Sequence, residues 1–221
     1  MNLPLLSLLE TRALGVLVEK QHTVPDTYPL TLLALTAGCN QKTSRDPILN
    51  ATETEVQAAL DHLKLLSLAI ESSGGRVMRY AHNVGRMLAI PSQAVALIAA
   101  LMLRGPQTVG ELRINCDRLH RFADISAVEA FLHELAARPA GALTVEFPRQ
   151  PGARETRWAH LLSGPPPEEV LRPVAAEAGG DTVAASEIAA LKANVAHLSD
   201  EIAALKATVA KLCAELGATG P

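Results

Sequence analysis

Residues 52–82 read TETEVQAALDHLKLLSLAIESSGGRVMRYAH. Thr52 and Glu55 have the spacing of a capping box, which marks the start of a helix. Apolar residues then recur at helical spacing, at Val56, Ala59, Leu60, Leu63 and Leu66. LAIE and RVMRY follow as two short strand-like runs, and the turn residues SSGG lie between them. This stretch predicts an amphipathic helix followed by a β-hairpin.

Two further helices are predicted upstream of this stretch. Ser7 and Glu10 form a second capping box, and apolar residues continue at helical spacing as far as Val18. The next apolar run covers residues 30–37 and ends at Gly38, which we expect to be the residue just after a helix. Three helices and a hairpin are the elements of a winged helix-turn-helix, so residues 1–85 are predicted to form one such domain.

The same order of elements recurs in residues 86–164. Helices are predicted over 91–103, from 109 onward and over 124–138, and LTVEF and RETRWAHLL form the strands of a second hairpin. A shift of 72 residues aligns the two third helices, so that Val56, Leu60 and Leu63 correspond to Val128, Leu132 and Leu135. We therefore expect a mostly α (α+β) chain with two tandem winged helix-turn-helix domains, related by duplication.

The end of the chain has a different composition. Residues 165–185 are rich in Pro, Ala, Gly and acidic residues, which predicts a flexible linker. Residues 186–217 show a heptad pattern, which predicts a coiled-coil helix and a parallel homodimer. The alternative is a single amphipathic helix that docks on its own protein. The predicted oligomerisation residues are Ile188, Leu191, Val195, Leu198, Ile202, Leu205, Val209, Leu212 and Leu216.

Charge and composition exclude some classes of function. The chain has 221 residues, 3% aromatic residues and a net charge of −3, which excludes a globally basic nucleic-acid binder. However, every cation in residues 86–164 is arginine, and this segment has a net charge of +2. The longest apolar run, residues 94–103, is about half the length of a membrane span, and the three cysteines lie far apart. We expect a cytoplasmic protein that does not enter membranes.

Candidate contacts to nucleic acid lie in loops and hairpins. In a winged helix the third helix enters the major groove and the hairpin contacts the backbone. The third helices themselves carry several carboxylates, which argues against strong DNA binding. The candidate nucleic-acid-binding residues are Gln41, Lys42, Ser44, Arg45, Arg76, Arg79, Arg113, Arg118, Arg121, Arg149, Arg154 and Arg157.

No motif for catalysis is present in the sequence. It contains no phosphate-binding GxxxxGK[ST], no HExxH for zinc and no GxSxG nucleophile elbow. We predict no catalytic residues, no metal site and no cofactor, and we expect that the protein is not an enzyme.

The residues also resemble a known family. LSLLETRALGVLVEKQHTVPDTYPLTLLALTAGCNQKTSRDPILN, residues 6–50, is similar to the opening of the YceH-like family. GPQTVGELRINCDRLHRFADISAVEAFLHELA, residues 105–136, and RWAHLLSG, residues 157–164, resemble its second half. The resemblance implies tandem winged helices, and it implies no catalytic residues.

Two functions follow as hypotheses. The first is a DNA-binding or transcription-regulatory factor that contacts duplex DNA and self-associates through its C-terminal helix. The alternative is a protein–protein scaffold or assembly factor that uses its winged helices as docking modules, which would suit the acidic third helices.

Overall fold

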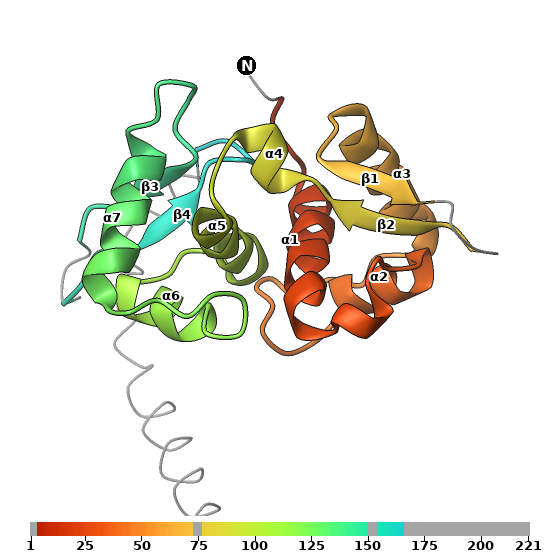
Figure 1. The fold of residues 1–221 in the computed structure, drawn as a ribbon, viewed down its shortest axis with the longest axis horizontal. Coiled ribbons are helices and arrows are strands. Elements are labelled where there is room, and N and C mark those ends of the chain that lie inside the picture. The colour runs from red at the N-terminus through yellow and green to blue at the C-terminus, as the bar shows by residue number, and fades with distance from the viewer. Residues whose placement is uncertain (1–3, 73–76, 150–153, 166–221) are drawn as a thin grey trace, which may run out of the picture. The chain divides into compact units, whose positions relative to one another are not determined.

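The computed structural model describes residues 4–72, 77–149 and 154–165 (Figure 1). The chain divides into two units, Met1–Arg172 and Pro173–Pro221, and all described residues belong to the first. Most of the predicted linker and all nine predicted oligomerisation residues lie outside the described residues. Within the described part of the chain, no helix is long and apolar enough to cross a membrane.

The first half of the described chain contains three α-helices and a hairpin. Both predicted capping boxes are confirmed, because Ser7 and Thr52 each accept a hydrogen bond from the backbone of the glutamate three residues later. The elements are α1 (Leu8–Thr23), the 3-10 turn η1 (Pro25–Thr27), α2 (Leu32–Cys39), α3 (Glu53–Leu65), β1 (Ala69–Ser72) and β2 (Arg79–His82).

The second half repeats this order after one short helix. That helix, α4, lies at the domain boundary expected near residue 85, and the sequence did not indicate it. The remaining strands are shorter than predicted. The elements are α4 (Val84–Leu88), α5 (Ser92–Arg104), α6 (Val109–Asn115), α7 (Ile125–Ala136), β3 (Thr144–Glu146) and β4 (Trp158–His160). The described chain is thus mostly helical, with small antiparallel sheets.

Each half has one two-stranded antiparallel sheet. In the first, Ala69 lies opposite His82; in the second, Thr144 lies opposite His160. The segment between the first two helices of each half adds one further bridge. Leu30 exchanges two backbone hydrogen bonds with Tyr80, and Gln107 exchanges two with Trp158. In both halves, the second strand of the hairpin is therefore hydrogen-bonded to the segment just before the second helix.

The third helices have the register that the sequence predicted. Val56, Leu60 and Leu63 of α3 are fully buried, and their counterparts Val128, Leu132 and Leu135 in α7 are at most 2% exposed. A buried leucine after each helix donates to equivalent carbonyls: Leu68 N to Leu63 O at 2.9 Å, and Leu143 N to Leu135 O at 3.0 Å. The two halves thus bury the same face of the third helix and turn into the hairpin through the same contact.

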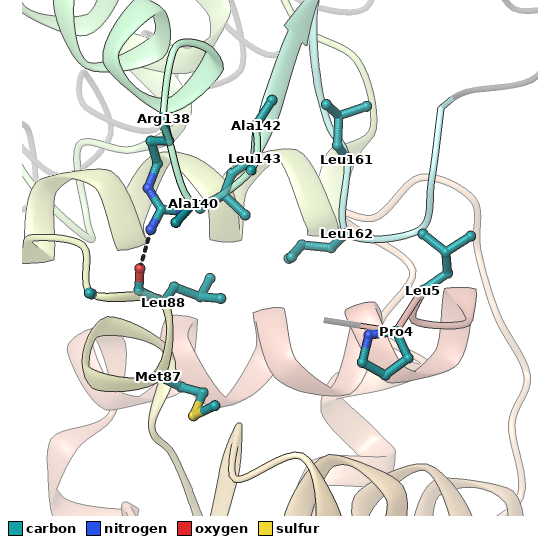
Figure 2. Close-up of a pocket in the computed structure, with 12 residues that line it drawn as sticks. Pro4, Leu5, Met87, Leu88, Arg138, Ala140, Ala142, Leu143, Leu161 and Leu162 are labelled. Carbon is teal, nitrogen blue, oxygen red and sulfur yellow. Dashed lines mark hydrogen bonds between the residues drawn. The ribbon is translucent and has the colours of Figure 1, made fainter. Parts of the chain in front are cut away.

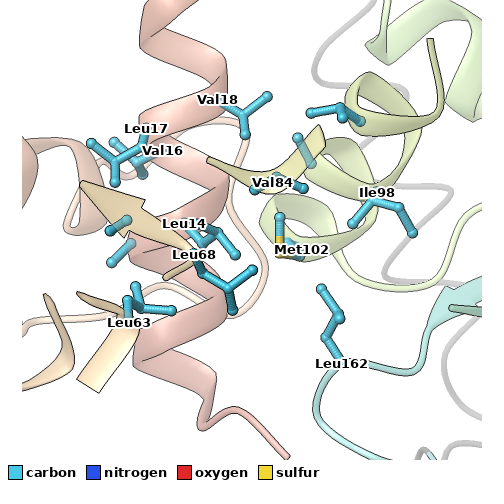
Figure 3. Packing of buried hydrophobic residues seen from close by; sticks show 14 of the residues in the cluster. Leu14, Val16, Leu17, Val18, Leu63, Leu68, Val84, Ile98, Met102 and Leu162 are labelled. Carbon is cyan, nitrogen blue, oxygen red and sulfur yellow. The ribbon is translucent and has the colours of Figure 1, made fainter. Parts of the chain in front are cut away.

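Helix α5 joins the two halves (Figure 1). Its residues Val95, Ile98 and Met102 belong to the hydrophobic cluster that surrounds α1, as Figure 3 shows for Ile98 and Met102. Its residues Leu97 and Leu101 belong to a second cluster with α7 and Trp158. Because α5 is covered on both sides, it is apolar all round, which explains the ten-residue apolar run in the sequence.

Gly38 lies inside α2 and does not follow it, so the predicted end of this helix is wrong. A Cβ atom at Gly38 would lie 2.5 Å from Cγ1 of Val16, closer than side chains tolerate. The glycine is therefore required by the close approach of α2 to α1. Asn40, two residues later, forms the C-cap.

Candidate nucleic-acid interface

The loop from residue 40 to residue 51 contains four of the candidate nucleic-acid-binding residues, Gln41, Lys42, Ser44 and Arg45. Arg45 is 7% exposed, and its Nε donates to the carbonyl of Gly38 at 3.2 Å. Both of its Nη atoms bind the Glu19 carboxylate, the shorter hydrogen bond being 2.6 Å. Burial alone would raise the pKa of Glu19, but the hydrogen bonds and charge of Arg45 outweigh it and lower the pKa. Arg45 is therefore a structural residue and does not lie on the surface as a contact to nucleic acid.

A second arginine, Arg12, also holds this loop by hydrogen bonds, and the sequence gave no indication of this role. Arg12 of α1 is fully buried, and it donates to the carbonyl oxygens of Cys39 at 3.2 Å and Pro47 at 2.6 Å. Arg12 and Arg45 thus bind the carbonyls at the C-terminus of α2, where a positive charge is favourable. An amphipathic pattern gives no signal for such a residue, because its partners are backbone atoms of distant segments.

The other candidates in this loop differ in exposure. The Gln41 side chain accepts a hydrogen bond from Lys20 and donates to Thr43. Ser44 is half-buried and has a positive φ of 61°. Lys42 is exposed, and the described residues offer its side chain no hydrogen bond or ion pair. Lys42 is the candidate of this loop that is free to meet a phosphate.

The described strands of the first hairpin contain one candidate arginine, Arg79. Arg76 lies outside the described residues. Arg79 is exposed, and its Nη1 donates to the carbonyl oxygens of Thr27 at 3.1 Å and Pro29 at 2.7 Å, which leaves Nη2 and Nε without a partner in the described residues. Next to the hairpin, Lys64 of α3 pairs with two carboxylates, Asp61 and Glu71.

The exposed stripes of the two third helices differ in charge. On α3 the exposed stripe is Thr54, Ala58, Asp61 and Leu65, with Glu53 beside it. The shift of 72 residues places Ser126, Ala130, His133 and Ala137 at the corresponding positions of α7 and just after it. This second stripe contains no carboxylate. Glu129 and Glu134 are exposed on either side of it, so the two helices differ in where their carboxylates lie.

Exposed arginines lie just before α7. Arg113 donates to the carbonyl of Ala123 at 3.3 Å, and Arg118 is exposed with no partner in the described part of the chain. Arg121 lies 3.6 Å from Asp117, but their side chains are 88% and 62% exposed, so the pair is weak.

Two more exposed arginines lie on the second hairpin, which packs against α7. Thr144 Oγ1 donates to the carbonyl of Leu132, and His133 contacts the edge of Trp158. Arg149 and Arg154 are exposed near the tip of this hairpin. Arg157 lies closer to its base, where it pairs with Glu111 at 3.2 Å and donates to Pro106 O. Arg149 and Arg154 are therefore more available than Arg157, although the sequence ranked them together.

Comparison with known proteins identifies the family. Residues 6–153 match the family described as "Protein of unknown function, DUF480". The chain belongs to this family. A UPF0502 protein of Methylibium petroleiphilum is 62% identical over 192 residues, covering 87% of this chain and 82% of the relative. A UPF0502 protein of Dechloromonas aromatica is 66% identical over 163 residues, covering 74% and 76% of the two chains.

The DUF480 match agrees with the YceH-like resemblance seen in the sequence. It runs from just before α1 into the second hairpin, and it includes the exposed residues Arg113, Arg118, Arg121 and Arg149 but not Arg154 or Arg157. The description of the DUF480 family assigns no function.

The thiols and acidic side chains of this DUF480 chain do not form a reactive cluster in the described residues. Cys39 and Cys116 are fully buried, and burial raises the pKa of each thiol to about 12. In the part of the chain that the structure describes, no group of three His, Cys, Asp or Glu residues could hold a metal ion.

Proposed function

We propose that each half of the chain is a winged helix and that the protein binds duplex DNA through its second half. The repeated order of helices and hairpin supports the first part of the proposal. A shift of 77 residues further relates the second helices, because Thr31 and Thr108 both cap them and Leu35 and Leu112 are both fully buried. The bridges from Leu30 and Gln107 to the second strands are a further feature that the two halves share.

The carboxylate-free stripe of α7, with exposed arginines on the adjoining segments, carries the DNA proposal. The stripe offers His133, which can hydrogen-bond to a base edge, and small alanines that permit close approach, while the Ser126 hydroxyl donates to Asp124 at 2.7 Å. Arg113, Arg118 and Arg121 precede the helix, and Arg149 and Arg154 extend from the hairpin. Phosphate contacts of this kind fix the position of a protein on DNA and make its affinity depend on salt.

Fluorescence anisotropy of the full chain with labelled duplexes tests this proposal. Arg118→Glu and Arg149→Glu should each weaken binding at least about tenfold and make the salt dependence shallower. Lys42→Glu is the matched control, because it reverses an exposed charge in the first half, and it should change affinity less than about twofold. Absence of binding at low salt, or an equal effect of Lys42→Glu, would refute the proposal.

Protein docking by the first half is the second candidate, and one observation favours it. Leu65, at the end of α3, is 83% exposed one helical turn after the carboxylate of Asp61. A surface of this kind repels phosphates and suits a partner with basic and apolar side chains. If Leu65→Ser and Asp61→Lys leave all protein partners in place in affinity purification, the first half does not dock through α3.

We also propose that residues 186–217 form a coiled coil that joins two copies of the chain. The heptad pattern supports this proposal. Light scattering should show a dimer for the full chain, and Leu198→Glu together with Leu205→Glu should convert it to a monomer. A full chain that is monomeric at micromolar concentration contradicts the coiled coil.

A further inference from the structure

An apolar pocket with one charged side chain lies beside the turn that follows α7 (Figure 2). Its volume is about 280 Å³. Its walls come from the segment before α1, from α4, from the turn between α7 and β3, and from the residues after β4. Leu88, Leu143 and Leu162 are buried members of the hydrophobic core and form its floor, whereas Pro4 and Leu5 lie at its rim.

Hydrogen bonds hold these walls in place. Leu6 N donates to Leu162 O at 2.8 Å, and Leu161 N donates to Leu143 O at 2.8 Å. The guanidinium of Arg138 donates to the carbonyl of Leu88, as the dashed line in Figure 2 shows. The pocket is therefore formed without a ligand, as most small-molecule sites are.

Charge and size indicate the class of ligand. Arg138 is the single charged residue among those that line the pocket in the described chain. Its second Nη atom and its Nε have no partner there, so they remain available to an anion. A dry cavity of about 150 Å³ holds one benzene molecule, so this pocket has room for a body of about eight to ten carbon atoms.

We propose that this pocket binds a small amphipathic monocarboxylate. The aliphatic or aromatic body lies on Leu88, Leu143 and Leu162, and the carboxylate accepts hydrogen bonds from Arg138. A charge-assisted pair with arginine distinguishes such a ligand from a neutral molecule of the same shape. The proposal does not depend on DNA binding, and it is tested on the protein alone.

Titration of the full chain with octanoate, followed by methyl NMR, tests the site. Octanoate should shift the signals of Leu88, Leu143, Leu162 and Met87, and should bind about tenfold more tightly than octanol.

Arg138→Gln should remove this preference, and Arg138→Lys should restore most of it. Arg86→Gln, which removes an arginine of α4 outside the pocket, is the matched control and should retain the preference. Ala142→Trp fills the rim and should weaken both ligands at least about tenfold.

Three results would overturn the proposal. The first is no binding of octanoate at millimolar concentration. The second is equal binding of octanoate and octanol, or a preference that Arg138→Gln leaves unchanged. The third is a set of nuclear Overhauser contacts, in ligand-free protein, between the Leu143 or Leu162 methyls and residues outside the described chain, because the chain itself would then fill the pocket.

Discussion

The guanidinium of Arg45 and the carboxylate of Glu19 are joined by two hydrogen bonds, 3.1 Å from Nη1 to Oε1 and 2.6 Å from Nη2 to Oε2. The Arg45 side chain is 0% exposed, and that of Glu19 is 14% exposed. This pair attaches the loop after α2 to α1. It also removes from the surface an arginine that a reader of the sequence would assign to a phosphate.

Loss of one partner of this pair should be costly. Glu19→Gln leaves the Arg45 charge buried without a counter-charge, so the free energy of unfolding should fall by roughly 3–5 kcal/mol. Urea denaturation, followed through the fluorescence of Trp158, measures this change. Lys42→Gln, which removes an exposed cation of the same loop, should change stability by less than about 0.5 kcal/mol. Equal effects of the two substitutions would contradict a structural role for the pair.

Stability should fall as the pH drops from about 6.5 to about 4. Burial lowers the pKa of His160 to about 4, and its Nδ1 has no hydrogen-bond partner in the described chain. The unfolded chain, with a pKa near 6.5, binds a proton in this range that the folded chain does not. The contribution of neutral His160 to the free energy of unfolding is complete above pH 6.5. At pH 4 this free energy has fallen by about 3 kcal/mol. His160→Leu should remove this contribution but leave that of His82, whose pKa burial also lowers to about 4, so the profile should become shallower without becoming flat.

Gly38→Ala should destabilise the fold even though alanine is the better helix former. The added Cβ would collide with Val16, and overpacking of this kind costs about 1–3 kcal/mol. Gly110→Ala is the matched control, because a Cβ there would lie 3.9 Å from Thr108 and stability should stay level or rise. Val16→Ala should recover part of the loss in the Gly38→Ala background, and simple additivity of the two changes would argue against the clash.

Cys39 and Cys116 should resist alkylation in the folded protein. Both thiols are fully buried, and their raised pKa, about 12, leaves almost no thiolate at neutral pH. Iodoacetamide labelling, read by mass spectrometry of the two peptides, should be slow in buffer and fast in denaturant. Rapid labelling of either cysteine in buffer would show that its surroundings open readily.

Local signals in the sequence predicted the helices well and the candidate site only partly. Thr52 and Ser7 mark helix starts because a capping box involves residues close together in the chain. The register of α7 followed from apolar spacing alone. In contrast, the burial of Arg12 depends on the carbonyls of Cys39 and Pro47, which are distant in sequence. Polar residues of this kind look like surface residues until tertiary contacts are known.

The DUF480 chain also shows how two similar helices can diverge in charge. Asp61 of α3 corresponds to His133 of α7, and Glu53 corresponds to Ile125. The count of acidic residues per helix hides this difference, because Glu129 and Glu134 lie beside the exposed stripe. For contact with a binding partner, the position of each charge on the helix face matters more than the total number of charges.

Helix α5 limits how this protein can be divided. A fragment that ends before residue 92 would leave the apolar side of α1 uncovered, and a fragment that starts at residue 86 would expose Val95, Ile98 and Met102 to water. Neither half has a complete core of its own. We therefore expect the described chain to unfold as one cooperative unit, and crystallographers or engineers who want a single half must first redesign the surface that α1 and α5 share.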